Sequence, residues 1–459
     1  MMSRVRPRRV GVACGFGVVV GVALVCGSGR AAASGTVWSA QAAPVPSGVV
    51  NTQDPELSRV ACQSGGVCFA VGTDQTGPEL DVSGANESGW QSIAVTMPAG
   101  IGQITWVGAA CPVSGDCVAV GFGDDGSGNP QGVILTGSGS TWTATEAPLA
   151  SGSSAVGTYP QGVACMASSC EVISQEDYST AVDAITGSGT SWTATQLPIP
   201  TGLPASAGGT SYQVEGVACS TAACAVAESY QYYFNNEPGD ISWVGFEVGG
   251  SGTAWSAKKL HAPSGETEDG GGWRDSAIGC AAAGKCVIAG VVGTYTVTSE
   301  FLASGTAGAT AWTTIAAPEP SDWTGQGPSL DGVACNSNKV CSVAGQYQVS
   351  GIPTGEFLAS SGGVNSTSDW VATGDLAATP GPIACAGSTG CASAGGALFF
   401  GSGTTWTSQA YPLTSGIYTD ESAGGVACWK SNHCLVAGFE YGTNKADDFI
   451  TKPLFWKIS

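Results

Sequence analysis

The stretch that decides the fold reads GAACPVSGDCVAVG over residues 108–121. Two short apolar runs, 108–111 and 117–121, flank a polar turn, and a cysteine stands at each edge of that turn. This pattern is typical of a tight antiparallel hairpin, in which directly opposed cysteines come within bonding range. The sequence therefore predicts a β-hairpin closed by a disulfide.

The same cysteine pair occurs eight times, and successive first cysteines lie 43 to 61 residues apart. A repeat period near fifty residues indicates an array of small supersecondary units that bury their faces only against one another. We expect one disulfide within each pair. The pairs are Cys62 and Cys68, Cys111 and Cys117, Cys165 and Cys170, Cys219 and Cys224, Cys280 and Cys286, Cys335 and Cys341, Cys385 and Cys391, and Cys428 and Cys434.

Each unit reads as four short strands. In the second unit, a polar loop at 124–130 leads to a third apolar run at 132–136, a GSGS turn and a fourth run at 141–145. Strands that are apolar on both faces must be covered on both faces, and a radial array supplies that cover. We therefore predict an all-β, eight-bladed β-propeller of four-stranded antiparallel blades. An open solenoid or two smaller domains are the alternatives.

The two ends of the repeat array indicate how the ring closes. Residues 36–40 (TVWSA) resemble a fourth strand with no earlier strands before it, and residues 453–457 (PLFWK) resemble a third strand with nothing after it. We expect the N-terminal strand to complete the last blade.

Residues 1–33 combine a basic start, an apolar run and the small residues Ala31–Ala33, which is typical of a secretory signal peptide. An uncleaved membrane anchor is the alternative. We therefore expect one propeller domain over 34–459, secreted to the extracellular space. In an exported chain, evenly paired cysteines favour disulfides over metal binding, and only His261 and His433 could add imidazole ligands.

Charge narrows the possible partners. Without the five arginines of the leader, ten basic residues remain against 35 acidic ones, a net charge of about −25. Such a chain repels nucleic acid and anionic lipid. We expect no nucleic-acid partner, no membrane association after cleavage of the leader, and a monomer.

The repeat VAC…CxAVG…GxW resembles the cysteine-paired repeats of exported actinobacterial β-propeller proteins. The GSGxTW turn is also distantly similar to the Asp-box (BNR) turn of sialidase-like propellers. Gly139, Thr141 and Trp142 match that turn, but Gly137 stands where the Asp should be. A sialidase also needs an arginine cluster for the substrate carboxylate, and only Arg59 and Arg274 remain after the leader. The resemblance thus implies the fold and not that activity.

Aromatic and acidic residues in the predicted loops are the candidate ligand contacts, because flat rings beside carboxylates suit sugars and also protein partners. Packing of these rings at blade edges is the alternative. We expect the blade-to-blade segments to open on one face of the ring. The candidates are Trp106, Tyr159, Tyr212, Trp273, Trp323, Tyr418, Asp269 and Asp322.

No catalytic motif or cofactor motif is present. The loop at Asp124 and Asp125 lacks the alternating spacing of a calcium loop, so we expect no metal and no cofactor. We favour a non-catalytic binding or scaffold protein that recognises carbohydrate or an envelope or protein partner. A polysaccharide-active hydrolase or lyase and a structural envelope protein are the alternatives.

Overall fold

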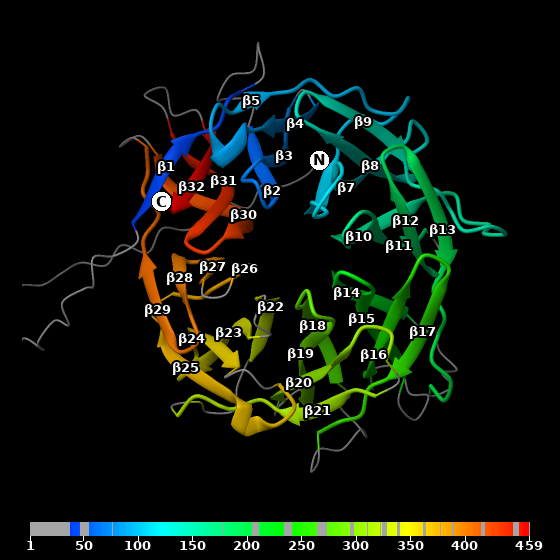
Figure 1. The fold of residues 1–459 in the computed structure, drawn as a ribbon, viewed down its shortest axis with the longest axis vertical. Helices are drawn as coiled ribbons and strands as arrows, with labels where there is room; N and C mark the ends of the chain where they lie inside the picture. The colour runs from blue at the N-terminus through cyan, green and yellow to red at the C-terminus, as the bar shows by residue number, and fades with distance from the viewer. Residues whose placement is uncertain are drawn as a thin grey trace, which may run out of the picture. The chain divides into compact units, whose positions relative to one another are not determined.

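The chain forms an eight-bladed β-propeller, seen along the ring axis in Figure 1. The computed structural model describes residues 37–45, 55–75, 77–177, 179–203, 211–233, 241–263, 273–293, 298–309, 311–321, 323, 328–336, 340–360, 364–376, 378–387, 390–414, 418–443 and 449–458. The predicted signal peptide lies outside these residues. Among the described residues, none belongs to a helix that could span a membrane.

Each blade is one four-stranded antiparallel sheet. Blades 1 to 4 are β2 (Glu56–Cys62), β3 (Cys68–Asp74), β4 (Gly77–Val82), β5 (Gln91–Ser92); β6 (Thr105–Ala110), β7 (Cys117–Asp124), β8 (Pro130–Ser138), β9 (Thr141–Glu146); β10 (Thr158–Cys165), β11 (Cys170–Glu176), β12 (Val182–Ser188), β13 (Ser191–Gln196); and β14 (Ser211–Cys219), β15 (Cys224–Tyr233), β16 (Ile241–Ser251), β17 (Ala254–Lys259).

Blades 5 to 8 follow the same order, and only two short 3-10 helices, η2 (Ala85–Glu87) and η4 (Thr367–Asp369), interrupt the described β-structure. These blades are β18 (Trp273–Cys280), β19 (Lys285–Gly293), β20 (Thr298–Thr306), β21 (Thr313–Ala316); β22 (Ser329–Cys335), β23 (Cys341–Val349), β24 (Ile352–Ser360), β25 (Trp370–Leu376); β26 (Ile383–Ala386), β27 (Gly390–Ala394), β28 (Leu398–Ser402), β29 (Thr405–Gln409); and β30 (Tyr418–Lys430), β31 (His433–Thr443), β32 (Phe449–Ile458), β1 (Trp38–Ala42).

The N-terminal strand closes the ring, as predicted. Strand β1 pairs antiparallel with β32, with Trp38 opposite Ile458 and Ala42 opposite Leu454. Blade 8 is therefore built from both ends of the chain (Figure 1). The prediction of a closed eight-bladed ring is confirmed.

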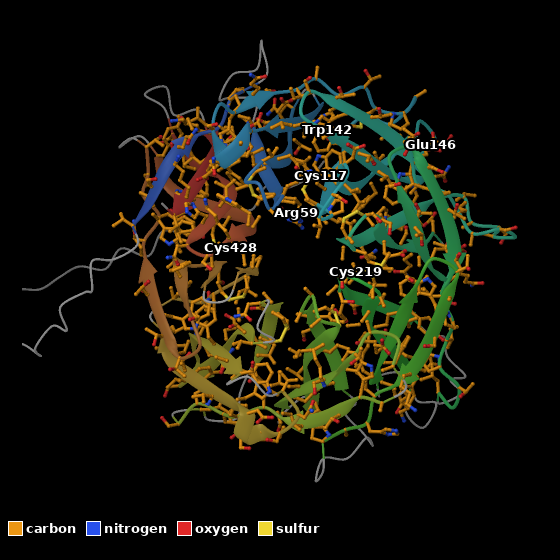
Figure 2. All side chains as sticks on the ribbon, in the orientation of Figure 1. Arg59, Cys117, Trp142, Glu146, Cys219 and Cys428 are labelled. Carbon is orange, nitrogen blue, oxygen red and sulfur yellow. A yellow bond between two sulfur atoms is a disulfide. The ribbon has the colours of Figure 1, made fainter. Side chains whose placement is uncertain are left out.

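All eight predicted disulfides are present, each within its own pair. The two half-cystines face each other across the first hairpin, and their Cα atoms lie 3.9 to 4.2 Å apart. Figure 2 shows Cys117, Cys219 and Cys428 on the inner side of their blades.

The core lies between blades, which explains why the second strands are apolar on both faces. In β7, Cys117 and Ala119 belong to the apolar cluster shared with blade 1, whereas Val118 and Val120 belong to the cluster shared with blade 3. Successive side chains of a strand point to opposite faces, so residues 117–120 pack alternately against the two neighbouring blades.

The GSGxxW turn has a structural reason for its glycines. Gly139 has a left-handed φ of 52°, and its carbonyl accepts a 2.9 Å hydrogen bond from the indole Nε1–H of Trp142. A Cβ on Gly137 would lie 2.2 Å from the carbonyl oxygen of Thr141 and 2.7 Å from the Trp142 ring. The aspartate of an Asp-box therefore has no room at this position. The same indole-to-carbonyl bond recurs at Trp192, Trp255 and Trp406.

Candidate functional site

Five of the six aromatic candidates lie in first strands, and only Trp323 among them lies outside a strand. Trp106 belongs to β6, is only 3% exposed, and donates its indole N–H to the carbonyl of Gly72 at 2.8 Å. Tyr418 begins β30, is 5% exposed, and has Lys452 Nζ 5.8 Å from its ring centre. The expectation that these two rings stand on an exposed face is wrong, because the first strands begin earlier than predicted.

Tyr159 and Tyr212 are half-buried and pack against other rings. Tyr159 in β10 meets Phe122 edge to face, with ring centres 5.2 Å apart. Tyr212 in β14 contacts Tyr230 at 5.2 Å and Phe246 at 6.1 Å. Burial, together with the nearby Tyr230 and Glu228, raises the pKa of Tyr212 to about 12. These two rings contribute to packing.

The other four candidates are less informative. Trp323 is half-buried, and its backbone N–H donates to the carbonyl of Pro320 at 3.1 Å. Trp273 starts β18, but its side chain lies outside the described residues, as do Asp269 and Asp322. The ligand-binding roles of Trp273, Asp269 and Asp322 therefore stay predictions.

The loop that contains Asp124 and Asp125 is closed by hydrogen bonds to a carboxylate. Asp125 Oδ1 accepts the backbone N–H groups of Ser127 at 2.7 Å and Asn129 at 2.9 Å. Hydrogen bonds from Asn129, and from the backbone at Ser127, lower the pKa of the Asp125 carboxyl. The carboxylate therefore closes its own loop. Within the described ranges, no group of three or more potential metal ligands occurs.

The repeat carries a second constant feature that sequence reasoning missed. Seven of the eight first strands contain a β-bulge at the same place, four residues before the first cysteine of the pair. A bulge leaves one residue out of the ladder and re-aims its side chain. The bulged residues are Ser58, Val107, Gln161, Glu215, Ser276, Asp331 and Gly424.

Arg59 ties three of these bulges together beside the ring axis (Figure 2). Its Nε donates to the carbonyl of Val107 at 2.9 Å, and its Nη1 donates to Ser58 at 2.7 Å and to Gly424 at 3.0 Å. Burial lowers the pKa of this guanidinium. Arg59 thus joins blades 8, 1 and 2 through backbone carbonyls that the bulges leave available.

On blades 4 to 6 the bulges build a cavity. Glu215, Ser276 and Asp331 come from three consecutive first strands and line one cavity of about 380 Å³. Its remaining lining residues are Val291, Pro328, Ser329 and Leu330. Ser329 Oγ donates a 2.5 Å hydrogen bond to Asp331 Oδ1. Burial raises the pKa of the Asp331 carboxyl, although this hydrogen bond opposes the shift.

A buried pair of carboxyl groups adjoins this cavity. Glu300 of blade 5 pairs in the sheet with Val291, and the nearby buried carboxyl of Glu356 in blade 6 is close enough to raise its pKa. Burial raises the pKa of Glu300 well above its usual range, and the charges of Glu356, Glu319 and Asp331 add to the rise. Burial and the like charges of its neighbours favour the neutral form of Glu300. The cavity thus holds hydrogen-bond acceptors and hydroxyl groups, beside two buried carboxyl groups.

Comparison with known proteins finds only distant structural similarities. Neither a protein-family model nor a curated protein sequence matches this chain. The polysaccharide lyase Uly1 is 10% identical, with a TM-score of 0.46, over 90% of this chain and 91% of the lyase. Sqt1 of Chaetomium thermophilum, bound to the N-terminus of ribosomal protein L10, is 8% identical with a TM-score of 0.45, over 87% and 97%. A subtype N11 neuraminidase-like protein is 11% identical with a TM-score of 0.37, over 92% and 94%.

Proposed function

We propose that this protein is an exported, non-catalytic binding propeller whose ligand site is the cavity of blades 4 to 6. The observation that carries the proposal is the placement of Glu215, Ser276 and Asp331, from three consecutive bulges, around one cavity. Eight disulfides suit an oxidising, extracellular setting. A cavity on a rigid disulfide-closed scaffold is a plausible location for recognition.

The lining residues favour a neutral or cationic, hydroxyl-rich ligand. Two carboxylates and two serine hydroxyls offer acceptors for sugar hydroxyl or amino groups. No Lys, Arg or His is among the residues that line the cavity in the described part of the chain. An anionic ligand would therefore face two like charges with no counter-charge, which is unfavourable.

A panel of immobilised neutral, amino-containing and acidic polysaccharides tests the proposal. The purified chain should be retained on a neutral or amino-containing polymer and should release no sugar. The double variant Glu215→Gln/Asp331→Asn should lose most of that retention. The matched control Glu146→Gln, at the exposed end of β9, should bind like wild type. Retention on acidic polymers alone would contradict the proposal.

A polysaccharide-active enzyme is the second candidate, and one observation favours it. Burial raises the pKa of Asp331 in the cavity and of Glu300 beside it, and a raised pKa favours the protonated form that a general acid needs. Released oligosaccharide in the same panel, lost in Asp331→Asn but kept in Glu146→Gln, would favour the enzyme over the binder.

A further inference from the structure

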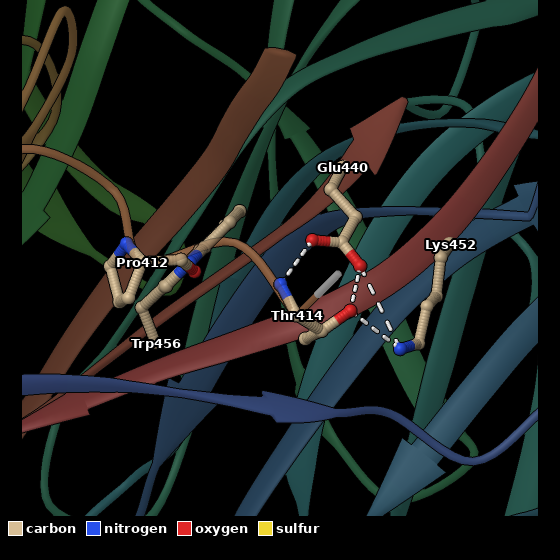
Figure 3. A network of polar contacts seen from close by, with 5 residues as sticks. All are labelled: Pro412, Thr414, Glu440, Lys452 and Trp456. Carbon is tan, nitrogen blue, oxygen red and sulfur yellow. Dashed lines mark hydrogen bonds and ion pairs between the residues drawn. The ribbon is translucent and has the colours of Figure 1, made fainter. Parts of the chain in front are cut away.

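In two connections between blades, a backbone N–H donates a hydrogen bond to a buried carboxylate of the next blade. The backbone N–H of Ala150 donates to Asp183 Oδ2 at 3.1 Å, between blades 2 and 3. The backbone N–H of Thr414 donates to Glu440 Oε2 at 2.8 Å, between blades 7 and 8 (Figure 3). In both connections the donor is the second residue after a proline. The connection thus offers an amide to a buried carboxylate in two interfaces, on the third strand of blade 3 and on the second strand of blade 8.

Four other connections have a second proline two residues after the first. They read APVP at 43–46, LPIP at 197–200, APEP at 317–320 and TPGP at 379–382, and lead into blades 1, 4, 6 and 7. Proline has no backbone N–H, so these connections cannot offer the amide. Blades 1 and 4 nevertheless carry buried carboxyls on the side that faces the preceding blade: Glu79 and Asp81 in blade 1, and Glu228 in blade 4.

The interface between blades 8 and 1, the 8/1 interface, shows the consequence most fully. Glu79 and Asp81 are both 0% exposed, and none of their four carboxyl oxygens has a hydrogen-bond partner in the described structure. Asp81 pairs with Ala70, which belongs to the apolar cluster shared with blade 8. Both carboxyls are therefore turned toward blade 8, because they are two residues apart on one strand.

The residues of blade 8 that cover this face are mostly apolar, namely Leu435, Ala437 and Phe455. Arg59 of β2 is held by backbone carbonyls. The other ionisable groups on the surrounding elements are Glu56 on β2, Asp74 on β3, Glu87 on η2, Tyr418, Asp420, Glu421 and Lys430 on β30, His433, Glu440 and Tyr441 on β31, and Lys452 and Lys457 on β32.

These ionisable groups do not offset the effect of burial on the pKa of Glu79 and Asp81. Burial first, then the charges of Asp81 and Asp74, raise the pKa of Glu79 to about 9, and burial raises that of Asp81 well above its usual range. The lysines Lys457 and Lys430 act on Glu87 instead, where they oppose the effect of burial.

We propose that protonation of Glu79 and Asp81 keeps the ring closed at the 8/1 interface. The interface is stable while both carboxyls are neutral, and its stability falls as they ionise. Among the described sheets only blade 8 is built from both ends of the chain, so the stability of this interface decides whether the ring stays closed. The described contacts across it include Thr451 Oγ1 to the carbonyl of Pro55 at 3.3 Å and the stacking of Trp90 on Phe455 at 3.9 Å. Neither contact can neutralise an ionised carboxyl.

The direction of the pH effect follows from linkage. An acid whose folded pKa lies above its unfolded value binds more protons in the closed state than in the opened state. Below the unfolded pKa the acid is neutral in both states, so it does not lower the free energy that stabilises closure. As the pH rises from there toward the folded pKa, this free energy falls. The window for Glu79 therefore runs from the ordinary glutamate range, about 4.3, to about 9.

Hydrogen exchange read by mass spectrometry tests the proposal. Protection factors of peptides that cover β1 and β32 are compared from pH 5 to pH 9, with β9 of blade 2 as the internal reference. In the wild-type chain the protection of β1 and β32 should fall relative to β9 by up to about tenfold per pH unit per carboxyl. The variant Glu79→Gln/Asp81→Asn keeps the shape but cannot ionise, so its protection should stay level over the same range.

Two further variants make the result specific. Asp183→Asn, whose carboxylate has an amide donor in the wild type, should leave the pH dependence at β1 and β32 unchanged. If the double variant does not fold, Glu79→Gln alone should remove about half of the pH dependence. A wild-type protection that is level across this range, or a double variant with the wild-type slope, would overturn the proposal. Loss of ligand retention in the polysaccharide panel has no bearing on it.

Discussion

Blade 8 packs against blade 7 on one face and blade 1 on the other, and these two interfaces differ in the hydrogen-bond partners of their buried carboxyl groups. At the 7/8 interface, Glu440 is 0% exposed but accepts hydrogen bonds from the backbone N–H and the hydroxyl of Thr414, and lies 3.7 Å from Lys452 Nζ (Figure 3). At the 8/1 interface, Glu79 and Asp81 are equally buried, and their oxygens have no hydrogen-bond partner in the described structure.

The difference shows that one residue of the connection between two blades decides whether a buried carboxyl on the next blade receives a hydrogen bond. Thr414 supplies an amide, and the corresponding residue before blade 1 is Pro46. A buried carboxylate without a donor costs several kcal/mol, so the group takes up a proton instead. Apolar side chains pack on both faces of blade 8, but the two faces differ in whether a hydrogen-bond donor reaches the buried carboxyl.

The largest effect is expected from the apolar packing at the 7/8 interface, to which Trp456 belongs. Trp456→Ala should lower the free energy of unfolding by about 3–5 kcal/mol, because the ring is 0% exposed and its indole N–H also bonds the carbonyl of Pro412 at 3.1 Å. Trp90→Ala, at the 8/1 interface, should cost less, because that ring is only half-buried. Urea unfolding at pH 6 measures both, and equal losses would contradict the comparison.

The next effect concerns the partnered carboxylate. Glu440→Gln should lower the free energy of unfolding by about 1.5–3 kcal/mol, the usual value of hydrogen bonds to a charged group. The loss should be present at pH 6 and at pH 8 alike, in contrast to Glu79→Gln, which should become more stable relative to wild type as the pH rises. Chemical unfolding at the two pH values separates the two variants. A stabilising Glu440→Gln would show that its partners do not compensate its burial.

A smaller effect is expected at the ring axis. Arg59→Lys should lower the free energy of unfolding by about 1–2 kcal/mol, because an ammonium cannot reproduce the fork that reaches the carbonyls of Val107, Ser58 and Gly424. Thermal unfolding of the variant gives this value. An unchanged transition would mean that the bulges of blades 8, 1 and 2 hold together without the guanidinium.

The smallest effect extends the comparison to the 3/4 interface. Glu228 is buried, its Oε1 has no hydrogen-bond partner in the described structure, and burial raises its pKa to about 8. Wild-type stability at this site is therefore lost as the pH rises from about 4.5 toward 8. Pro200→Ala restores an amide at the place that Ala150 occupies before blade 3.

At pH 5 Pro200→Ala should destabilise the protein by about 0.5–1 kcal/mol, because the unfolded chain gains freedom. By pH 8 the difference should disappear or reverse, because the new donor favours the ionised form of Glu228. A difference between variant and wild type that is the same at both pH values would contradict this expectation.

The sequence alone determined the architecture. The cysteine spacing gave the first hairpins, the apolar runs gave four strands a blade, and the unmatched ends at 36–40 and 453–457 gave the closure by β1. These features are local: each depends on residues a few positions apart or on a pattern that repeats. The glycines of the GSGxxW turn belong here too, because each serves the tryptophan a few residues later.

Only the tertiary structure decided which residues are available for function. Trp106 and Tyr418 have loop-like neighbours in the sequence but lie in first strands, where adjoining blades bury them. The bulges at Glu215, Ser276 and Asp331 shift the register by one residue, which changes the face on which a side chain lies, and no propensity announces such a shift. Their constant position, four residues before the first cysteine of the pair, was the one signal that could have revealed them.

The burial of Glu79 and Asp81 depends on a connection and a blade that lie about thirty-five residues apart in the chain. Their chemistry follows from burial against blade 8, at the other end of the chain, and burial is a property of the closed ring.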